Sequence, residues 1–482
     1  MTNLIFEKSR NGRRGVIPPR GTAGEPIALP KEALRKSLHL PELGEVDVVR
    51  HFTELASRNY NVDKGFYPLG SCTMKYNPKI NEDAANQEGF LRLHPLQEED
   101  ETQGAMRLMY TLSTMLSEIT GFPAFTLQPA AGAHGELTGL LIIKAALKDK
   151  NETRRNRILI PDSAHGTNPA SAAALGFEIV EIPSDGRGNI SLDLLAAEAD
   201  DRTAALMLTN PSTLGLFEEN ILQVTKIIHD AGGYVYGDGA NLNAIVGITR
   251  PADLGFDVLH INLHKTFATP HGSGGPGSGP VGVTKDLEPY LPAPILVKKG
   301  GRIRLDYNRE KSIGRVRSYF GNFGVMVRAY AYMRSLGGRG LKRMSEQAVL
   351  SANYMRVKLK DYPPAIDRTC MHEVVLTGKP LADETGVHTL DVAKSLLDYG
   401  VHAPTIYFPL IVPEALMIEP TETENKDTLD AYAELLLKIR QEAKTNPEKI
   451  KTAPHNTPVR RLNETQAARN PVLRWTPKKN GG

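Results

Sequence analysis

Lys265 follows an apolar stretch and precedes the glycine-rich run Gly272–Pro280, a placement that suits a nucleophilic lysine. A lysine that is partly buried near cationic groups loses its proton more readily, and the free amine can then attack an aldehyde. The placement of Lys265 therefore indicates a residue that forms a Schiff base with the aldehyde of pyridoxal 5'-phosphate. The alternative is an ordinary solvated lysine, and the segments around it argue against that alternative.

Two residues upstream could complete such a site. Asp238 ends an apolar stretch, where a carboxylate can pair with the pyridine nitrogen of the cofactor and keep the ring an electron sink. His165 follows an apolar stretch that ends at Ile160, and its flat side chain can stack on the ring. A turn or helix cap is the alternative for Asp238, and a cap of the next helix is the alternative for His165. We predict Lys265, Asp238 and His165 as catalytic residues.

The segment Gln128–Glu136 could supply a phosphate site. The backbone N–H groups at a helix start and the helix dipole favour an anion, although many tight strand–helix turns look the same. Asn210 could bond to the phenolic oxygen of the cofactor, or could form an ordinary turn with Pro211. The predicted cofactor-binding residues are Lys265, Asp238, His165, Ala131, Gly132, Thr209, Asn210, Ala240 and His264.

Two further patterns near the lysine suggest a dinucleotide site and a zinc site, but neither is supported by its surroundings. Gly277, Gly279 and Gly282 spell the dinucleotide pattern G-x-G-x-x-G, but a strand-like segment follows where that fingerprint needs a helix. Three histidines also lie close together in the sequence, yet no carboxylate or cysteine pattern supports a zinc site, and we predict no metal. These histidines are His260, His264 and His271.

Apolar segments that could form strands alternate with amphipathic helical stretches from about residue 105. This alternation predicts an α/β fold with a mostly parallel sheet and helices on both faces. Ligands of such sheets lie at the carboxyl ends of the strands, which is where the candidate residues fall. The predicted strands span 157–160, 178–180, 204–208, 234–236 and 258–261, and the predicted helices include 170–175 and 221–229.

We expect four parts along the chain, of which the third forms a smaller domain. That domain should contain a strand at 372–376, a helix at 389–399 that ends at Gly400, and a second helix with a buried face. The buried face is indicated by Leu429, Tyr432, Leu436 and Ile439. The four parts are an extended N-terminal arm at 1–100, a large cofactor-binding domain at 101–344, the small C-terminal domain at 345–450 and a tail at 451–482.

Composition excludes several classes of protein. The 482 residues include 58 basic and 55 acidic side chains that are scattered along the chain, which argues against a nucleic-acid binder. Cys72 and Cys370 show no Cys-x-x-Cys spacing, which fits a reducing compartment. No apolar stretch follows the N-terminal arginines, and Leu137–Ala146 is too short to span a membrane. We therefore expect a soluble cytoplasmic protein.

Several segments together closely resemble the P-protein of the glycine cleavage system, a glycine decarboxylase that uses pyridoxal phosphate. The resemblance runs from about residue 50 to 440 and so covers most of the chain. It departs from the family pattern at Ser273, within a run that is often all glycine, and at Ala131, where single-chain relatives often have serine. The segments are Phe66–Lys75, Gln128–Glu136, Ala164–Pro169, Thr209–Pro211 with Leu214–Glu218, Asp238–Asn241 and His264–Gly282.

The resemblance implies a fold-type I pyridoxal-phosphate-dependent transferase-like fold, with a large domain and a smaller C-terminal α+β domain. It implies decarboxylation of glycine, with transfer of the aminomethyl group to the lipoyl arm of H-protein. The length resembles the second chain of the split, two-chain form, which implies a partner first subunit in an α2β2 assembly with the active site at the subunit boundary.

Some questions stay open at the level of sequence. Another enzyme of the same fold, such as an aminotransferase or a cysteine-desulfurase-like protein, is an alternative, and so is a non-catalytic scaffold subunit. The residues that bind the carboxylate of glycine are not identified by the sequence. Arg315, Arg317 and Arg328 are candidates, although each could instead have a structural or solvated role.

Overall fold

The computed structural model describes residues 3–17, 29–36, 38, 40–95, 97–272, 277–474 and 476. The chain forms two compact units, Met1–Gly65 and Phe66–Gly482. The middle of the glycine-rich run, Ser273–Pro276, lies outside the described residues. The four-part division expected from the sequence stays a prediction.

The first unit contains one α-helix, α1 (Glu45–Ser57), and the short 3-10 helix η1 (Lys31–Ala33) within its described residues. Asp47 in the first turn of α1 forms an ion pair with Arg13 at 2.9 Å, so the start of the chain folds back on this helix. An acidic residue in a first turn also complements the helix dipole. The sequence predicts an extended arm over this range, and the helix α1 is an addition to that prediction.

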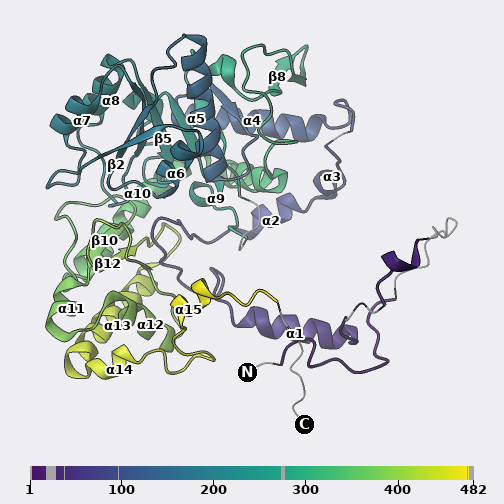
Figure 1. The fold of residues 1–482 in the computed structure, drawn as a ribbon, viewed down its shortest axis with the longest axis vertical. Helices are drawn as coiled ribbons and strands as arrows, with labels where there is room; N and C mark the ends of the chain where they lie inside the picture. Colours follow the sequence, from purple (N-terminus) through teal and green to yellow (C-terminus); the bar gives the residue numbers. More distant parts are fainter. Residues whose placement is uncertain are drawn as a thin grey trace. The chain divides into compact units, whose positions relative to one another are not determined.

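A seven-stranded sheet organises the second unit (Figure 1). Its strand order is β1-β7-β6-β5-β4-β2-β3. The pairs from β3 through β6 are parallel, whereas β7 is antiparallel to both neighbours, so the expected mostly parallel sheet is confirmed. The strands are β1 (Ala124–Thr126), β2 (Arg157–Pro161), β3 (Glu178–Ile182), β4 (Thr203–Thr209), β5 (Tyr234–Gly239), β6 (Val258–Ile261) and β7 (Val281–Val283). All five predicted strands are present.

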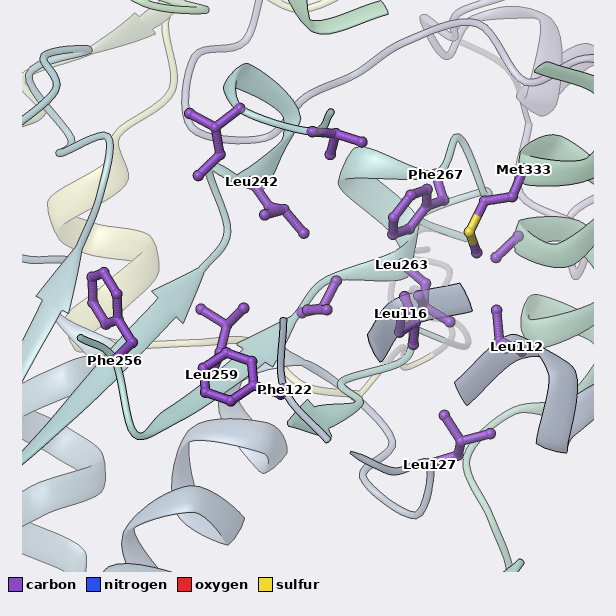
Figure 2. Close-up of a cluster of buried hydrophobic side chains, with 14 of the residues drawn as sticks. Leu112, Leu116, Phe122, Leu127, Leu242, Phe256, Leu259, Leu263, Phe267 and Met333 are labelled. Carbon is purple, nitrogen blue, oxygen red and sulfur yellow. The ribbon is translucent and has the colours of Figure 1, made fainter. Parts of the chain in front are cut away.

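Helices cover both faces of this sheet because alternate side chains of each strand point to opposite faces. Leu206 and Leu208 of β4 join one core cluster with α4, α8 and α10, and Ala205 and Met207 join another with α5. Figure 2 shows the first cluster, which contains Leu112 and other wholly buried side chains. The helices of this region are α2 (Lys79–Ala85), α3 (Glu88–Leu91), α4 (Gln103–Thr120), α5 (Gly132–Asp149), α6 (Thr167–Ala174), α7 (Leu192–Glu198), α8 (Ile221–Asp230), α9 (Leu263–Thr266) and α10 (Phe323–Lys358).

A second, antiparallel sheet has the order β10-β12-β11, with β10 (Val374–Thr377), β11 (Thr405–Ile406) and β12 (Ala415–Ile418). The predicted strand at 372–376 and helix at 389–399 correspond to β10 and α12. The predicted helix face is buried in α13 at Leu429, Tyr432, Leu436 and Ile439. The helices of this region are α11 (Lys379–Thr385), α12 (Thr389–Asp398), α13 (Lys426–Thr445), α14 (Pro447–Lys451) and α15 (Glu464–Arg469).

The remaining regular elements are small. A two-stranded hairpin joins β8 (Ile295–Lys299) to β9 (Arg302–Asp306). Three further 3-10 helices are η2 (Leu242–Ala244), η3 (Pro251–Leu254) and η4 (Glu288–Tyr290). Among the described residues, no helix combines the length and the apolar character that crossing a membrane would require.

Candidate active site

The predicted site residues meet at the carboxyl edge of the large sheet. Thr209 at the end of β4 is in register with Asp238 of β5, and Gly239 is in register with Ile261, which directly precedes the α9 region. A cavity of about 220 Å³ opens at this edge. It is lined by Ser71, Gly132, Ala133, Glu136, His165, Thr167, Thr209, Thr213, Asp238, Ala240, Asn241, His260, Asn262, His264 and Lys265.

Lys265 lies on the short helix α9, which is anchored by the buried side chains of Leu263 and Thr266. Its Nζ donates a hydrogen bond of 2.8 Å to the carbonyl oxygen of Ser71. Burial, and then the positive charge of Lys265, lowers the pKa of His271 to about 4. Burial also lowers the pKa of His264, to about 3. Both rings are therefore neutral at neutral pH.

Asp238 is almost completely buried and is held in its ionised form. Burial alone would raise its pKa, but nearby His260 and Lys265 outweigh this effect and lower the pKa below the usual value. The carboxylate also accepts hydrogen bonds from the Ala240 amide at 2.9 Å and from Nδ2 of Asn168 at 3.1 Å. A buried carboxylate with several donors keeps its negative charge. Asp238 can thus hold a proton on a ring nitrogen that faces it.

His260 is a neighbour of Asp238 whose protonated nitrogen can be assigned from its partners. Burial raises the pKa of Tyr236 well above its usual value, so this phenol keeps its proton. The hydroxyl of Tyr236 lies 2.6 Å from Nδ1 of His260. Nε2 of His260 lies 2.8 Å from Oδ1 of Asn262 and 3.3 Å from Oδ1 of Asp238. Because both of these oxygens are acceptors, Nε2 carries a hydrogen.

Glu136 is a buried site residue to which the sequence analysis gave no role. Its carboxylate accepts hydrogen bonds from Thr167 at 2.8 Å, Asn168 at 3.1 Å and Ser171 at 3.2 Å. Because Asn168 also donates to Asp238, the two carboxylates share one donor. The start of α6, which carries these three donors, is thereby fixed against the cavity.

The start of α5 faces the cavity through Gly132 and Ala133. A Cβ atom on Gly132 would lie 2.5 Å from Nδ2 of Asn262, so only glycine fits at this position. A Cβ on Gly279 would overlap the carbonyl oxygen of Ala131. The described end of the glycine-rich run therefore packs against the first residues of α5. The first backbone N–H groups of a helix have no acceptor within the helix and are free to bind a ligand. This is an anion-binding geometry.

Seven of the nine predicted cofactor residues line the cavity, and Ala131 and Asn210 do not. Ala131 is the N-cap of α5, directly before Gly132. Oδ1 of Asn210 accepts a hydrogen bond of 3.1 Å from the amide of Glu218, while its Nδ2 has no hydrogen-bond partner among the described residues. The exposed ring of His165 lies 2.9 Å from Oγ1 of Thr167 through Nδ1.

The three arginine candidates for a substrate carboxylate differ in their contacts. Arg328 forms two hydrogen bonds with the carboxylate of Glu82, at 2.8 and 2.7 Å, so its charge is already paired. Arg317 donates to Asn322 at 3.4 Å, and the guanidinium of Arg315 lies over the ring of Tyr307. None of the three arginines is among the residues that line the cavity.

Known proteins are similar to this chain in both sequence and fold. The family described as glycine cleavage system P-protein matches residues 26–401, and the glycine dehydrogenase C-terminal domain matches residues 344–461. A "probable glycine dehydrogenase (decarboxylating) subunit 2" of Caldanaerobacter subterraneus subsp. tengcongensis is 62% identical, over 98% of this chain and 99% of that protein. A protein of the same description from Thermotoga maritima is 57% identical, over 98% and 99% of the two chains.

Solved structures agree in fold. A glycine decarboxylase (P-protein) of the glycine cleavage system, in inhibitor-bound form, has a TM-score of 0.72 at 22% identity and covers 85% of this chain and 93% of its own. A cysteine desulfurase from Thermococcus onnurineus has a TM-score of 0.59 at 16% identity, over 78% and 95% of the two chains. The fold is therefore that of the fold-type I pyridoxal-phosphate-dependent enzymes. Within this class, the chain belongs to the glycine cleavage system P-protein family.

Proposed function

We propose that this chain is the second subunit of a two-chain glycine dehydrogenase (decarboxylating). This enzyme removes the carboxylate of glycine and transfers the aminomethyl group to the lipoyl arm of H-protein. The observation that carries the proposal is that Lys265 and Asp238 line one cavity in a chain of the P-protein family. The relatives that match almost the whole chain have the same description.

The residues around the cavity fit pyridoxal phosphate. An amine, an ionised buried carboxylate and the start of an 18-residue helix converge on one space. Thr209 also lines the cavity, and its buried Oγ1 has no hydrogen-bond partner among the described residues. Such a donor set matches an aldehyde, a pyridine nitrogen, a phosphate and a phenolic oxygen. When bound, this cofactor supplies an electron sink for the electrons left by the loss of carbon dioxide.

Each residue would act on a different part of that cofactor. Lys265 would hold it covalently through Nζ, and Asp238 would keep a proton on the ring nitrogen. The amides of Gly132 and Ala133 would bind the phosphate, and His165 would cover one face of the ring. The remaining predicted contacts are those of Ala131, Thr209, Asn210, Ala240 and His264.

The partners follow from the same assignment. The relatives are named as second subunits, so we propose a first-subunit partner in an α2β2 assembly with the active site at the subunit boundary. The acceptor substrate would be the lipoyl arm of H-protein. Arg315 and Arg317 stay candidates for the glycine carboxylate, whereas the pairing of Arg328 with Glu82 makes it the weakest of the three. A cytoplasmic location stays a prediction.

The test is to express the chain together with the first subunit of the same genome and to measure exchange between glycine and bicarbonate, with and without lipoylated H-protein. We expect exchange that H-protein accelerates. Turnover that depends on an α-keto acid would instead favour an aminotransferase. A chain that shows no cofactor absorbance would be a scaffold, and either result would overturn the proposal.

A further inference from the structure

The segment Leu69–Lys75, here called the strap, lies between Lys265 and the antiparallel sheet β10-β12-β11, here called the small sheet. Leu69 pairs with Ile418 at the end of β12 in an antiparallel bridge. A Cβ on Gly70 would overlap the side chain of Met417, so the strap passes β12 with no room for a larger residue. The strap is therefore tightly packed on the small sheet.

The middle of the strap reaches the candidate nucleophile. The carbonyl oxygen of Ser71 accepts the 2.8 Å hydrogen bond from Nζ of Lys265. Ser71 and Thr73 have φ values of 64° and 48°, which are left-handed conformations that residues other than glycine rarely adopt. Such backbone persists only where the surroundings hold it in place.

Two buried glutamates hold the strap in this conformation. Oε2 of Glu373 accepts a 2.6 Å hydrogen bond from the amide of Ser71, and Oε2 of Glu419 accepts a 2.7 Å hydrogen bond from the amide of Thr73. Both glutamates are 0% exposed. Glu373 directly precedes β10 and Glu419 directly follows β12, so both come from the small sheet.

The second oxygen of each carboxyl points toward the same side chain. Nε2 of His372 lies 3.8 Å from Oε1 of Glu373 and 3.9 Å from Oε1 of Glu419, which is too long for a hydrogen bond. A ring nitrogen of His372 and one carboxyl oxygen of each glutamate lie within 4.8 Å of one another. Neither carboxyl Oε1 and neither ring nitrogen of His372 has a hydrogen-bond partner among the described residues.

Both side chains are shielded from solvent, so two ionised carboxylates in this position would repel each other strongly. Burial, and then the neighbouring Glu419, raises the pKa of Glu373 well above its usual value. Burial raises the pKa of Glu419 to about 7 and lowers that of His372 to about 3. The other titratable groups that interact with this cluster are Lys265, Lys75, Cys72 and Cys370.

We propose that Glu373 and Glu419 together hold one proton, so that this pair positions the strap carbonyl at Lys265 while it carries a single negative charge. The inference rests on the proposed function in one respect, namely that Lys265 is the residue that binds the cofactor. Glu373 and Glu419 are positioning residues, because they act on Lys265 through the amides of Ser71 and Thr73.

The single charge has a consequence for the lysine. Two negative charges near Nζ would favour the ammonium form, which cannot attack an aldehyde. No negative charge at all would leave the strap amides without their strongest acceptors. One proton on the pair satisfies both strap amides and still allows Lys265 to release its own proton.

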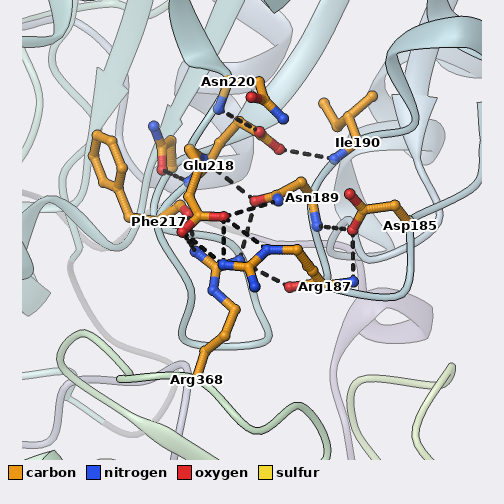
Figure 3. A network of polar contacts seen from close by, with 10 residues as sticks. Asp185, Arg187, Asn189, Ile190, Phe217, Glu218, Asn220 and Arg368 are labelled. Carbon is orange, nitrogen blue, oxygen red and sulfur yellow. Dashed lines mark hydrogen bonds and ion pairs between the residues drawn. The ribbon is translucent and has the colours of Figure 1, made fainter.

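The experiment compares Glu373→Gln, Glu419→Gln and the double variant. Glutamine keeps an oxygen for the strap amide and resembles a protonated glutamate in shape and charge. Glu218→Gln is the matched control, since Glu218 is also buried and accepts two backbone amides, from Ile190 at 2.8 Å and Asn220 at 2.9 Å (Figure 3). Two quantities are measured in the assembled enzyme: the protonated-carboxyl infrared band with ¹³C-labelled glutamate, and the pH titration of the cofactor's absorbance.

We expect the wild-type protein to show, at about pH 8, a protonated-carboxyl band that both single variants lose and the control keeps. Each single variant retains one negative charge, so its absorbance titration should stay within about 0.3 pH unit of wild type, whereas the double variant should titrate at least about one unit lower. A purely structural role would not produce this pattern of charges.

Three results would overturn the inference. One is the absence of the band from the wild-type protein, a measurement that needs no variant to fold. Another is a shift in the pH titration of the cofactor's absorbance that is as large for the first glutamine substitution as for the second, which would mean that both carboxyls are ionised. The third is one divalent cation per chain that the double variant loses, because a metal would then take the place of the proton. A chain without cofactor absorbance would refute the proposed function, while the infrared band would still test the carboxyl pair.

Discussion

Nε2 of His260 lies 3.3 Å from Oδ1 of Asp238, and both side chains are almost wholly buried beneath the candidate site. Because the two oxygens next to Nε2, from Asn262 and Asp238, are both acceptors, this contact places a ring N–H against an ionised carboxylate. A positive charge or a donor close to a carboxylate favours its charged form. His260 therefore helps to keep Asp238 ionised.

The first prediction concerns the charge of Asp238. Asp238→Asn preserves the shape of the side chain but removes the charge that would hold a proton on the ring nitrogen. We expect it to cost about 3 kcal/mol of transition-state stabilisation, the scale measured for the loss of one preorganised electrostatic group, or roughly a hundredfold in kcat. Glycine–bicarbonate exchange measures the effect. Near-normal exchange would show that Asp238 serves only as a turn residue.

The second prediction concerns Lys265. Lys265→Ala should abolish the visible absorbance of the covalently bound cofactor and stop glycine–bicarbonate exchange, because no other lysine lines the cavity among the described residues. Lys226→Ala is the control, since Lys226 is an exposed residue that pairs with Asp230 on α8. Exchange at the wild-type rate in Lys265→Ala would remove the lysine from the mechanism.

The large sheet and the two central residues of the site can be predicted from the sequence for the same physical reason. Each buried parallel strand is a short apolar run, and a polar residue that follows such a run must lie at the carboxyl edge. Asp238 is the second-last residue of β5, after its apolar part, and Lys265 follows β6. Where the sequence alone is insufficient, the contact joins residues that are far apart along the chain.

The strap illustrates this limit. Its hydrogen bond from Ser71 to Glu373 spans 302 positions, and the one from Thr73 to Glu419 spans 346. One signal was nevertheless present, because Glu373 directly precedes the apolar residues Val374–Leu376 and Glu419 directly follows the apolar strand β12. A carboxyl in such a place must be paired, hydrogen-bonded or protonated. Glu136 gave a weaker signal, since a charged residue near a helix start is common on protein surfaces.

The third prediction tests the core beneath the site. Leu112 of α4 is wholly buried in the cluster of Figure 2. Leu112→Ala removes buried methyl groups and leaves a cavity, so it should lower stability by about 2–5 kcal/mol. Leu222→Ala on α8 is the matched control, because this side chain is 63% exposed and its loss should change stability by less than about 0.5 kcal/mol. Thermal unfolding of both variants measures the difference, and equal shifts would contradict this account of the core.

The fourth prediction concerns the pH dependence of stability through His229, in the last turn of α8. A 2.9 Å contact between its Nε2 and Oδ2 of Asp257 raises the pKa of His229. The folded protein therefore binds the proton more tightly than the unfolded chain. The resulting stabilisation is complete below the unfolded pKa of about 6.5 and is lost as the pH rises through the folded value.

His229→Gln should consequently lower the melting temperature most at about pH 6 and have a much smaller effect at about pH 9, where the wild-type ring is neutral. In an Asp257→Asn background the same substitution should show little pH dependence, because the carboxylate that favours the charged ring is gone. Melting temperatures of the four proteins across this range measure the coupling between the two residues. A destabilisation by His229→Gln that stays constant from acid to alkaline pH would mean that the contact is a neutral hydrogen bond.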